Sequence, residues 1–223
     1  MKKLAQRSIS FSPPDISELE IREVAEALAS GWITTGPRTK QLEKNLAVYL
    51  GLPIEAPNVV CLNSATAAEE LNLRILGIGE GDEVLIPAYT YTSTASAAIH
   101  TGATIRFIDC QKDNYEMDYN ALETAITEKT KAVIPVDLGG IVCDYEKIFG
   151  VVEKKKHLFR ASGNTDLGNR IQNAIGRVAV VADCAHALGA SKRGVMAGNI
   201  ADFSSFSFHA VNVLETEMRE MGL

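Results

Sequence analysis

The chain has 223 residues, of which 46% are hydrophobic and 22% are charged, values that are ordinary for a globular protein and argue against global disorder. This length is enough to bury the core of one large domain. The formal net charge of −6 argues against a general nucleic-acid binder, because affinity for the phosphate backbone needs clustered Lys and Arg.

The cysteines and the N-terminus bear on the cellular compartment. The four cysteines are widely spaced and form no CxxC pair, so a zinc motif is missing and reduced thiols are expected. Residues 1–7 are basic, but no long apolar core follows them, and no apolar stretch approaches membrane-spanning length. We therefore expect a cytoplasmic protein without a metal site, a membrane partner or a nucleic-acid partner.

Residues 1–51 predict a helical lead-in. Asp15 or Ser17 can cap a helix that runs to about Ser30, and Gly31 ends it. A loop with the only tryptophan follows, and a second helix is predicted over residues 39–49. The first helix carries an apolar stripe formed by Ile16, Leu19, Val24, Ala27 and Leu28.

Strand-like and helix-like segments then alternate. Strands are predicted over residues 59–62, 83–86, 104–108, 132–136, 178–182 and 203–208. Helices are predicted over residues 65–76, 93–100, 119–126, 145–156 and about 167–175, and residues 162–166 are predicted to form a surface excursion. This alternation predicts an α/β domain over residues 52–211, with a mostly parallel sheet flanked by helices on both faces.

Small hydroxyl residues follow the first predicted strand, at the start of its helix. Ser64, Ala65 and Thr66 lie in the segment Asn63–Ala67. A helix N-terminus has free backbone N–H groups and a favourable dipole for an anion, so a phosphate could bind there. An ordinary N-cap is the alternative, and for this segment alone it is the commoner outcome.

Other polar groups follow the next strands. Tyr91 could stack on a flat ring or simply pack, and Asp183 could bind a cationic ring nitrogen or cap the following turn. His186 could donate to a ring oxygen or be a satisfied core histidine, and Ser207 could bind a phosphate or be an ordinary strand serine. Since parallel strands end at one edge of a sheet, these groups together predict a site for pyridoxal phosphate (PLP).

Several segments resemble the DegT family of PLP-dependent nucleotide-sugar aminotransferases, in the aspartate aminotransferase superfamily (fold type I). The matching segments are residues 31–37, 62–67, 77–84, 182–187 and 202–211. The resemblance implies the fold-type I large domain and transfer of an amino group, typically from glutamate, to a nucleotide-linked keto-sugar. It also implies a homodimer whose sites are shared between subunits.

The resemblance also assigns roles to individual residues. The turn formed by Ser64, Ala65 and Thr66 would bind the cofactor phosphate together with Ser207. Tyr91 would stack on the pyridine ring, Asp183 would bind the ring nitrogen, and His186 would bind the ring hydroxyl. Near the active site the resemblance places Trp32, Thr34, Thr35 and His209.

The chain departs from the family at the position of the Schiff-base lysine, which is Asn212. The family needs that lysine as the amine that holds the cofactor and as the base that moves the substrate proton. An asparagine amide does neither, so we assign no catalytic residue and expect no transamination by this chain. Lys192 is close in sequence, but nothing in the sequence places it at the site.

The resemblance ends at Val211, and we interpret residues 212–223 as a divergent tail. In the family the next segment adds a strand between residues 59–62 and 203–208, and a C-terminal small domain follows. We therefore expect an incomplete large domain produced by a frameshift, an early stop or a deliberate truncation. The alternative is a non-catalytic cofactor-binding, nucleotide-sugar-binding or regulatory fragment. A dehydratase variant is disfavoured, because it needs histidine rather than asparagine at position 212.

Overall fold

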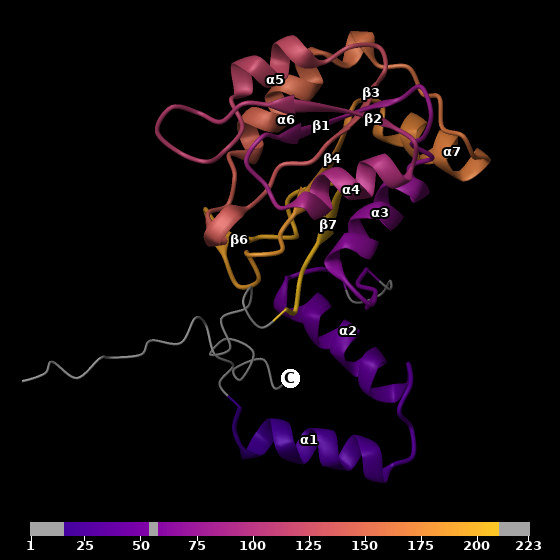
Figure 1. The fold of residues 1–223 in the computed structure, drawn as a ribbon, viewed down its shortest axis with the longest axis vertical. Helices are drawn as coiled ribbons and strands as arrows, with labels where there is room; N and C mark the ends of the chain where they lie inside the picture. Colours follow the sequence, from indigo (N-terminus) through magenta and orange to yellow (C-terminus); the bar gives the residue numbers. More distant parts are fainter. Residues whose placement is uncertain (1–15, 54–57, 210–223) are drawn as a thin grey trace, which may run out of the picture.

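The structure is a computed structural model that describes residues 16–53 and 58–209. Its centre is a five-stranded sheet of order β2-β1-β3-β4-β7, in which every adjacent pair is parallel (Figure 1). The strands are β1 Glu83–Pro87, β2 Thr104–Ile108, β3 Thr130–Val133, β4 Ala179–Asp183 and β7 Phe203–Ser205. A short antiparallel hairpin precedes β7 and consists of β5 Ser191–Lys192 and β6 Val195–Met196.

Helices cover both faces of the sheet, as predicted. The described chain contains α1 Glu18–Ala29, α2 Pro37–Tyr49, α3 Ala65–Ile75, α4 Thr92–His100, α5 Tyr119–Ala125, α6 Tyr145–Lys154 and α7 Asp166–Ile175, with 3-10 turns η1 Leu138–Gly140 and η2 Lys156–Leu158. The helices that pack on the sheet are α3 to α7. Successive strand side chains point to opposite faces. Val180 and Ala182 of β4 therefore pack with α5 and α6, whereas Ala179 and Val181 pack with α3, α4 and α7. The predicted mostly parallel α/β architecture is confirmed.

The end of β4 is fixed by an interrupted ladder with β3. The strand predicted over residues 132–136 stops at Val133, because Pro135 has no N–H group to donate. Pairing resumes as one bridge between Val136 and Asp183. The N–H of Asp183 donates to the Pro135 carbonyl at 2.9 Å, and the N–H of Asp137 donates to the Asp183 carbonyl at 2.9 Å. These bonds hold the backbone of Asp183 rigidly at the rim of the sheet.

Two further predicted strands differ from the structure. Residues 59–62 form no strand, and β7 ends at Ser205 rather than Phe208. A strand needs a neighbour that takes up its backbone hydrogen bonds, and among the described strands β7 pairs with β4 alone. The N–H of Cys61 instead donates to Glu43 of α2 at 3.0 Å. Residues 59–62 and 203–208 both border one cavity.

The N-terminal helix α1 forms as predicted but lies apart from the sheet (Figure 1). Ser17 caps it through a capping box with Glu20. No residue of α1 is buried, and the apolar stripe faces solvent in the described part of the chain. Arg38 of α2 forms ion pairs with two glutamates of α1, Glu23 and Glu26. Within residues 16–53 and 58–209, no helix combines the length and the apolar character that a bilayer crossing requires.

Candidate functional site

A cavity of about 1190 Å³ opens beside the carboxyl ends of β4 and β7. Its other walls come from α2, α3 and the segment that leads into α3. Ligands of open α/β sheets bind outside the carboxyl ends of the strands, so this is the expected place for a site. All seven predicted cofactor residues line it, namely Ser64, Ala65, Thr66, Tyr91, Asp183, His186 and Ser207, and His209 lines it as well.

The N-terminus of α3 supplies an anion-binding edge. Ser64 is the N-cap, and its Oγ accepts the N–H of Ala67 at 3.1 Å. The N–H groups of Ala65 and Thr66 belong to the first turn, where no preceding carbonyl can receive them. The ordinary N-cap and the phosphate site are therefore compatible, because capping uses only one of the first-turn N–H groups and the helix dipole favours an anion beside the rest.

Tyr91 and Tyr89 have different surroundings. Tyr91 is the N-cap residue of α4, lines the cavity and is 76% exposed. Tyr89 is not among the lining residues, and its ring stacks on that of Tyr115 with centroids 4.8 Å apart. Of the two, Tyr91 is the tyrosine that can cover a planar ligand in the cavity.

Asp183 is a buried carboxylate with two hydrogen-bond donors. It is 3% exposed. Oδ2 accepts from Oγ1 of Thr94 at 3.0 Å, and Oδ1 accepts from the N–H of Ala185 at 3.1 Å. The second bond caps the turn after β4, so the capping alternative is also present. Donors stabilise the ionised form of a carboxyl, and each carboxylate oxygen keeps a second lone pair for a cationic ligand.

The backbone contact of His186 selects the tautomer of its neutral imidazole. The N–H of Gly139 donates to Nδ1 of His186 at 3.3 Å. Since Nδ1 accepts that bond, a neutral imidazole carries its proton on Nε2. His186 lines the cavity, so Nε2–H is a hydrogen-bond donor available to an oxygen bound there.

The segment after β7 completes the lining. Oγ of Ser207 accepts from the N–H of His209 at 3.2 Å. Ser204 also lines the cavity, and its buried Oγ has no hydrogen-bond partner within the described structure. A buried hydroxyl without a partner is costly, and a polar ligand in the cavity would offer it one.

Three predicted residues lie elsewhere. Trp32, Thr34 and Thr35 are exposed in the loop between α1 and α2, and none of them lines the cavity. Nε1 of Trp32 donates to the carbonyl of Thr35 at 3.1 Å, a hydrogen bond within the same loop.

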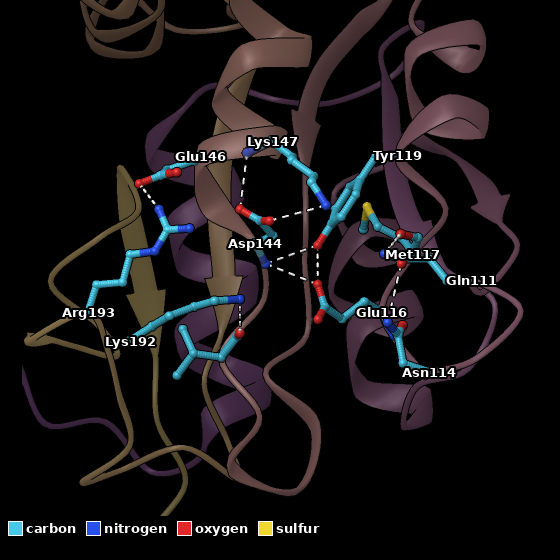
Figure 2. A network of polar contacts seen from close by, with 11 residues as sticks. Gln111, Asn114, Glu116, Met117, Tyr119, Asp144, Glu146, Lys147, Lys192 and Arg193 are labelled. Atoms are coloured by element: carbon cyan, nitrogen blue, oxygen red, sulfur yellow. Dashed lines mark hydrogen bonds and ion pairs between the residues drawn. The ribbon is translucent and has the colours of Figure 1, made fainter.

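Lys192 is also turned away from the cavity. Its Nζ donates to the carbonyl of Val142 at 2.9 Å, and its neighbour Arg193 pairs with Glu146 (Figure 2). Lys192 is not among the lining residues. Asn212 and the whole of residues 212–223 fall outside the described residues.

Sequence reasoning missed Glu69 and Thr94, which are buried beside Asp183. The signal for Glu69 was its helical spacing from Leu73 and Leu76, which puts an acid in the buried stripe of α3. For Thr94 no signal was readable, because the α4 segment contains several Ser and Thr residues. No group of three or more His, Cys, Asp or Glu suited to a metal ion occurs within the described residues.

This donor set fits PLP. A helix N-terminus and Ser207 suit a phosphate, a buried carboxylate suits a ring nitrogen, and an imidazole N–H suits a ring oxygen. The parallel sheet with helices on both faces and this rim define the large domain of a PLP-dependent aminotransferase. A model of the DegT/DnrJ/EryC1/StrS aminotransferase family matches residues 14–159 and 168–219, and the chain belongs to this family.

Individual relatives agree with the family. The chain is 39% identical over 208 residues to the spore coat polysaccharide biosynthesis protein SpsC of Bacillus subtilis, with 93% of this chain and 47% of SpsC covered. It is 37% identical over 203 residues to the UDP-4-amino-4-deoxy-L-arabinose–oxoglutarate aminotransferase of Shewanella sediminis, with coverage of 91% and 46%.

A solved structure supports the same fold. The PLP form of the putative sugar aminotransferase Spr1654 from Streptococcus pneumoniae superposes with a TM-score of 0.85 at 50% identity. That match covers 96% of this chain and 57% of Spr1654. The chain therefore spans about half the length of the relatives it matches.

Proposed function

We propose that this chain is the cofactor-binding domain of a PLP-dependent sugar aminotransferase. Its substrates are an amino-acid donor, glutamate, and a nucleotide-linked keto-sugar. The observation that carries the proposal is that Asp183, a buried carboxylate with two donors, shares one cavity with the N-terminus of α3. The names of the relatives support the substrate classes, since the Shewanella protein is a UDP-sugar–oxoglutarate aminotransferase.

Each side chain has a separate task in this proposal. PLP supplies the electron sink for amino-group transfer. The first turn of α3 and Ser207 hold the phosphate, and Asp183 accepts a hydrogen bond from the ring nitrogen. Nε2–H of His186 donates to the ring hydroxyl, and Tyr91 covers one face of the ring. These contacts orient the cofactor without a covalent bond.

The chain alone binds the cofactor reversibly and does not transaminate, according to this proposal. Asn212 stands at the Schiff-base lysine position and offers neither a nucleophilic amine nor a base. Lys192 does not replace that lysine, because it is bound to the Val142 carbonyl away from the cavity.

Equilibrium titration of the purified chain with PLP tests the proposal. We expect saturable binding that dialysis reverses, loss of at least about tenfold in affinity for Asp183→Ala, and no change for Thr124→Ala on the exposed side of α5. Borohydride treatment followed by mass spectrometry should find no pyridoxyl-lysine. Covalent attachment to a lysine together with amino-group transfer would contradict the non-catalytic part, and absence of binding would contradict the whole.

A second copy of the chain is the proposed protein partner. Val24 and Leu28 of α1 are 60% and 63% exposed, an arrangement expected of a face that another subunit covers. Trp32 does not line the cavity of its own chain, which suits a site shared between subunits. Sedimentation should give a dimer that a Val24→Asp/Leu28→Asp double variant dissociates and that exposed Leu167→Asp leaves intact. A monomeric parent chain would refute this part.

A further inference from the structure

Glu69 is a buried acid without a counter-charge. It lies on α3, is 1% exposed and faces the sheet at β4 and β7. Neither carboxyl oxygen accepts a hydrogen bond from a described donor, and none of the ion pairs formed by the described residues includes Glu69. An ionised carboxylate in such a place would cost several kcal/mol, so a protonated carboxyl is the form that the surroundings tolerate.

The polar neighbours of Glu69 are Asp183 and Ser205. Asp183 receives hydrogen bonds from Thr94 and from the N–H of Ala185. The hydroxyl of Ser205, the donor beside Glu69, is directed to the Ala182 carbonyl at 3.4 Å. Two adjacent buried carboxyls cannot both ionise without a cation. Since the donors gather at Asp183, the negative charge belongs there and the proton belongs on Glu69.

The other elements around α3 do not change this assignment. The helix packs against α4, α7, β4 and β7. The charge on these elements that acts on Glu69 is that of Asp183. Burial, followed by the negative charge of Asp183, raises the pKa of Glu69 to about 10.

We propose that Glu69 keeps its proton and donates it in a hydrogen bond to Asp183, and so acts as a positioning residue for the carboxylate that faces the cavity. The Glu69 proton gives the Asp183 carboxylate a third hydrogen-bond donor. With a pyridine ring bound, the proton between ring and carboxylate then stays on the ring nitrogen. This last consequence rests on the proposed function, whereas the proton on Glu69 does not.

The first test uses the full chain without cofactor. With ¹³Cδ-labelled glutamate, one NMR signal should remain in the protonated position near pH 8, and it should be missing from Glu69→Gln. Ordinary glutamates titrate near about pH 4.3. Titration of every glutamate signal in that range would overturn the proposal, whatever the chain binds.

The second test uses ¹⁵N-labelled PLP, whose ring-nitrogen shift reports protonation. Glu69→Gln keeps an N–H donor, so it should match the parent chain in this shift and bind PLP within about twofold. Glu69→Leu removes the donor, and the signal should move toward the unprotonated value with about tenfold weaker binding. An unchanged signal in Glu69→Leu would overturn the proposal. If no form binds PLP, the proposed function fails, and the first test still decides the position of the proton.

Discussion

Thr94 donates a hydrogen bond of 3.0 Å to Oδ2 of Asp183, and Oγ1 of Thr90 lies 2.8 Å from Oγ1 of Thr94. This chain of three side chains joins the start of α4 to the end of β4. It holds the buried carboxylate of Asp183 at the wall of the cavity.

The Thr94 bond predicts a stability effect. Thr94→Val keeps the shape of the side chain but removes the donor, so the buried carboxylate of Asp183 loses the hydrogen bond from Thr94. Hydrogen bonds to charged groups contribute about 1.5–3 kcal/mol, and we expect the free energy of unfolding in urea to fall by that amount. The exposed control Thr124→Val should change it by less than about 0.5 kcal/mol. Equal values for the two variants would contradict the role of Thr94.

Glu69 predicts a pH dependence of stability. Its folded pKa of about 10 lies above its unfolded value of about 4.3, so only the folded chain holds the proton between these values. The contribution to stability is complete below about pH 4.3 and decreases as the pH rises, by at most about 1.4 kcal/mol per pH unit, until the folded pKa is passed.

Comparison with Glu69→Gln isolates this effect, because glutamine does not titrate. Urea unfolding at about pH 5 and about pH 8 should show the variant gaining stability relative to the parent chain as the pH rises. Parallel curves would mean that Glu69 is ionised in the folded protein.

Two glycines predict opposite effects of the same substitution. A Cβ on Gly168 of α7 would lie 2.6 Å from Cα of Gly77, whereas a Cβ on Gly150 of α6 would meet no atom within 4 Å. Gly168→Ala should therefore lower the melting temperature, with a cost of about 1–3 kcal/mol from overpacking. Gly150→Ala should raise the melting temperature, with a gain of up to about 1 kcal/mol in the free energy of unfolding, because alanine is the better helix former. A tolerated Gly168→Ala would show that α7 does not pack so closely on Gly77.

A half-buried ion pair joins the strands that border the cavity. Nη1 of Arg177 contacts Oδ2 of Asp202 at 2.7 Å, and Nη2 contacts Oδ1 at 2.9 Å. Oδ2 of Asp202 also accepts the N–H of Val180 of β4 at 2.8 Å. Asp202→Asn should lower the free energy of unfolding by about 2–3 kcal/mol, because it replaces the bidentate charged partner of Arg177 by a neutral amide and leaves only Glu153, 3.2 Å from Nε, as an acidic partner.

The exposed pair of Arg193 and Glu146 is the control for this measurement, since surface pairs contribute about 0–1 kcal/mol. Glu146→Gln should unfold at nearly the same urea concentration as the parent chain. A similar loss for both variants would show that burial does not strengthen the Arg177–Asp202 pair.

The sequence predicted the sheet because periodicity and end signals coincide in these segments. β4 is an unbroken run of Val and Ala before an acid, and α3 begins after a serine cap. Where the sequence prediction differs from the structure, the difference comes from interactions between segments that are distant in the sequence. Whether residues 59–62 form a strand depends on a neighbouring strand, and their own composition does not reveal that the N–H of Cys61 binds Glu43.

The residues at the strand ends of the site were predictable from the sequence, but the helix residues that contact Asp183 were not. Strand ends meet at one edge, so Asp183, His186 and Ser207 could be grouped from the chain order alone. Glu69 and Thr94 come from helices, and their approach to Asp183 depends on how α3 and α4 are oriented on the sheet.

The surface excursion predicted for residues 162–166 is exposed in part, but the N–H of Asn164 donates to the Gly77 carbonyl at 2.8 Å.

The alternation of side chains along β4 has an evolutionary consequence. Asp183 falls on the same face as Ala179 and Val181, beside α3 and α4, whereas Cys184 joins the layer of α5 and α6. Loss or gain of a single codon within β4 would exchange the two faces and move the acid into the opposite layer. We therefore expect point substitutions in β4 to be tolerated more often than insertions or deletions, because only insertions and deletions change the face on which Asp183 lies.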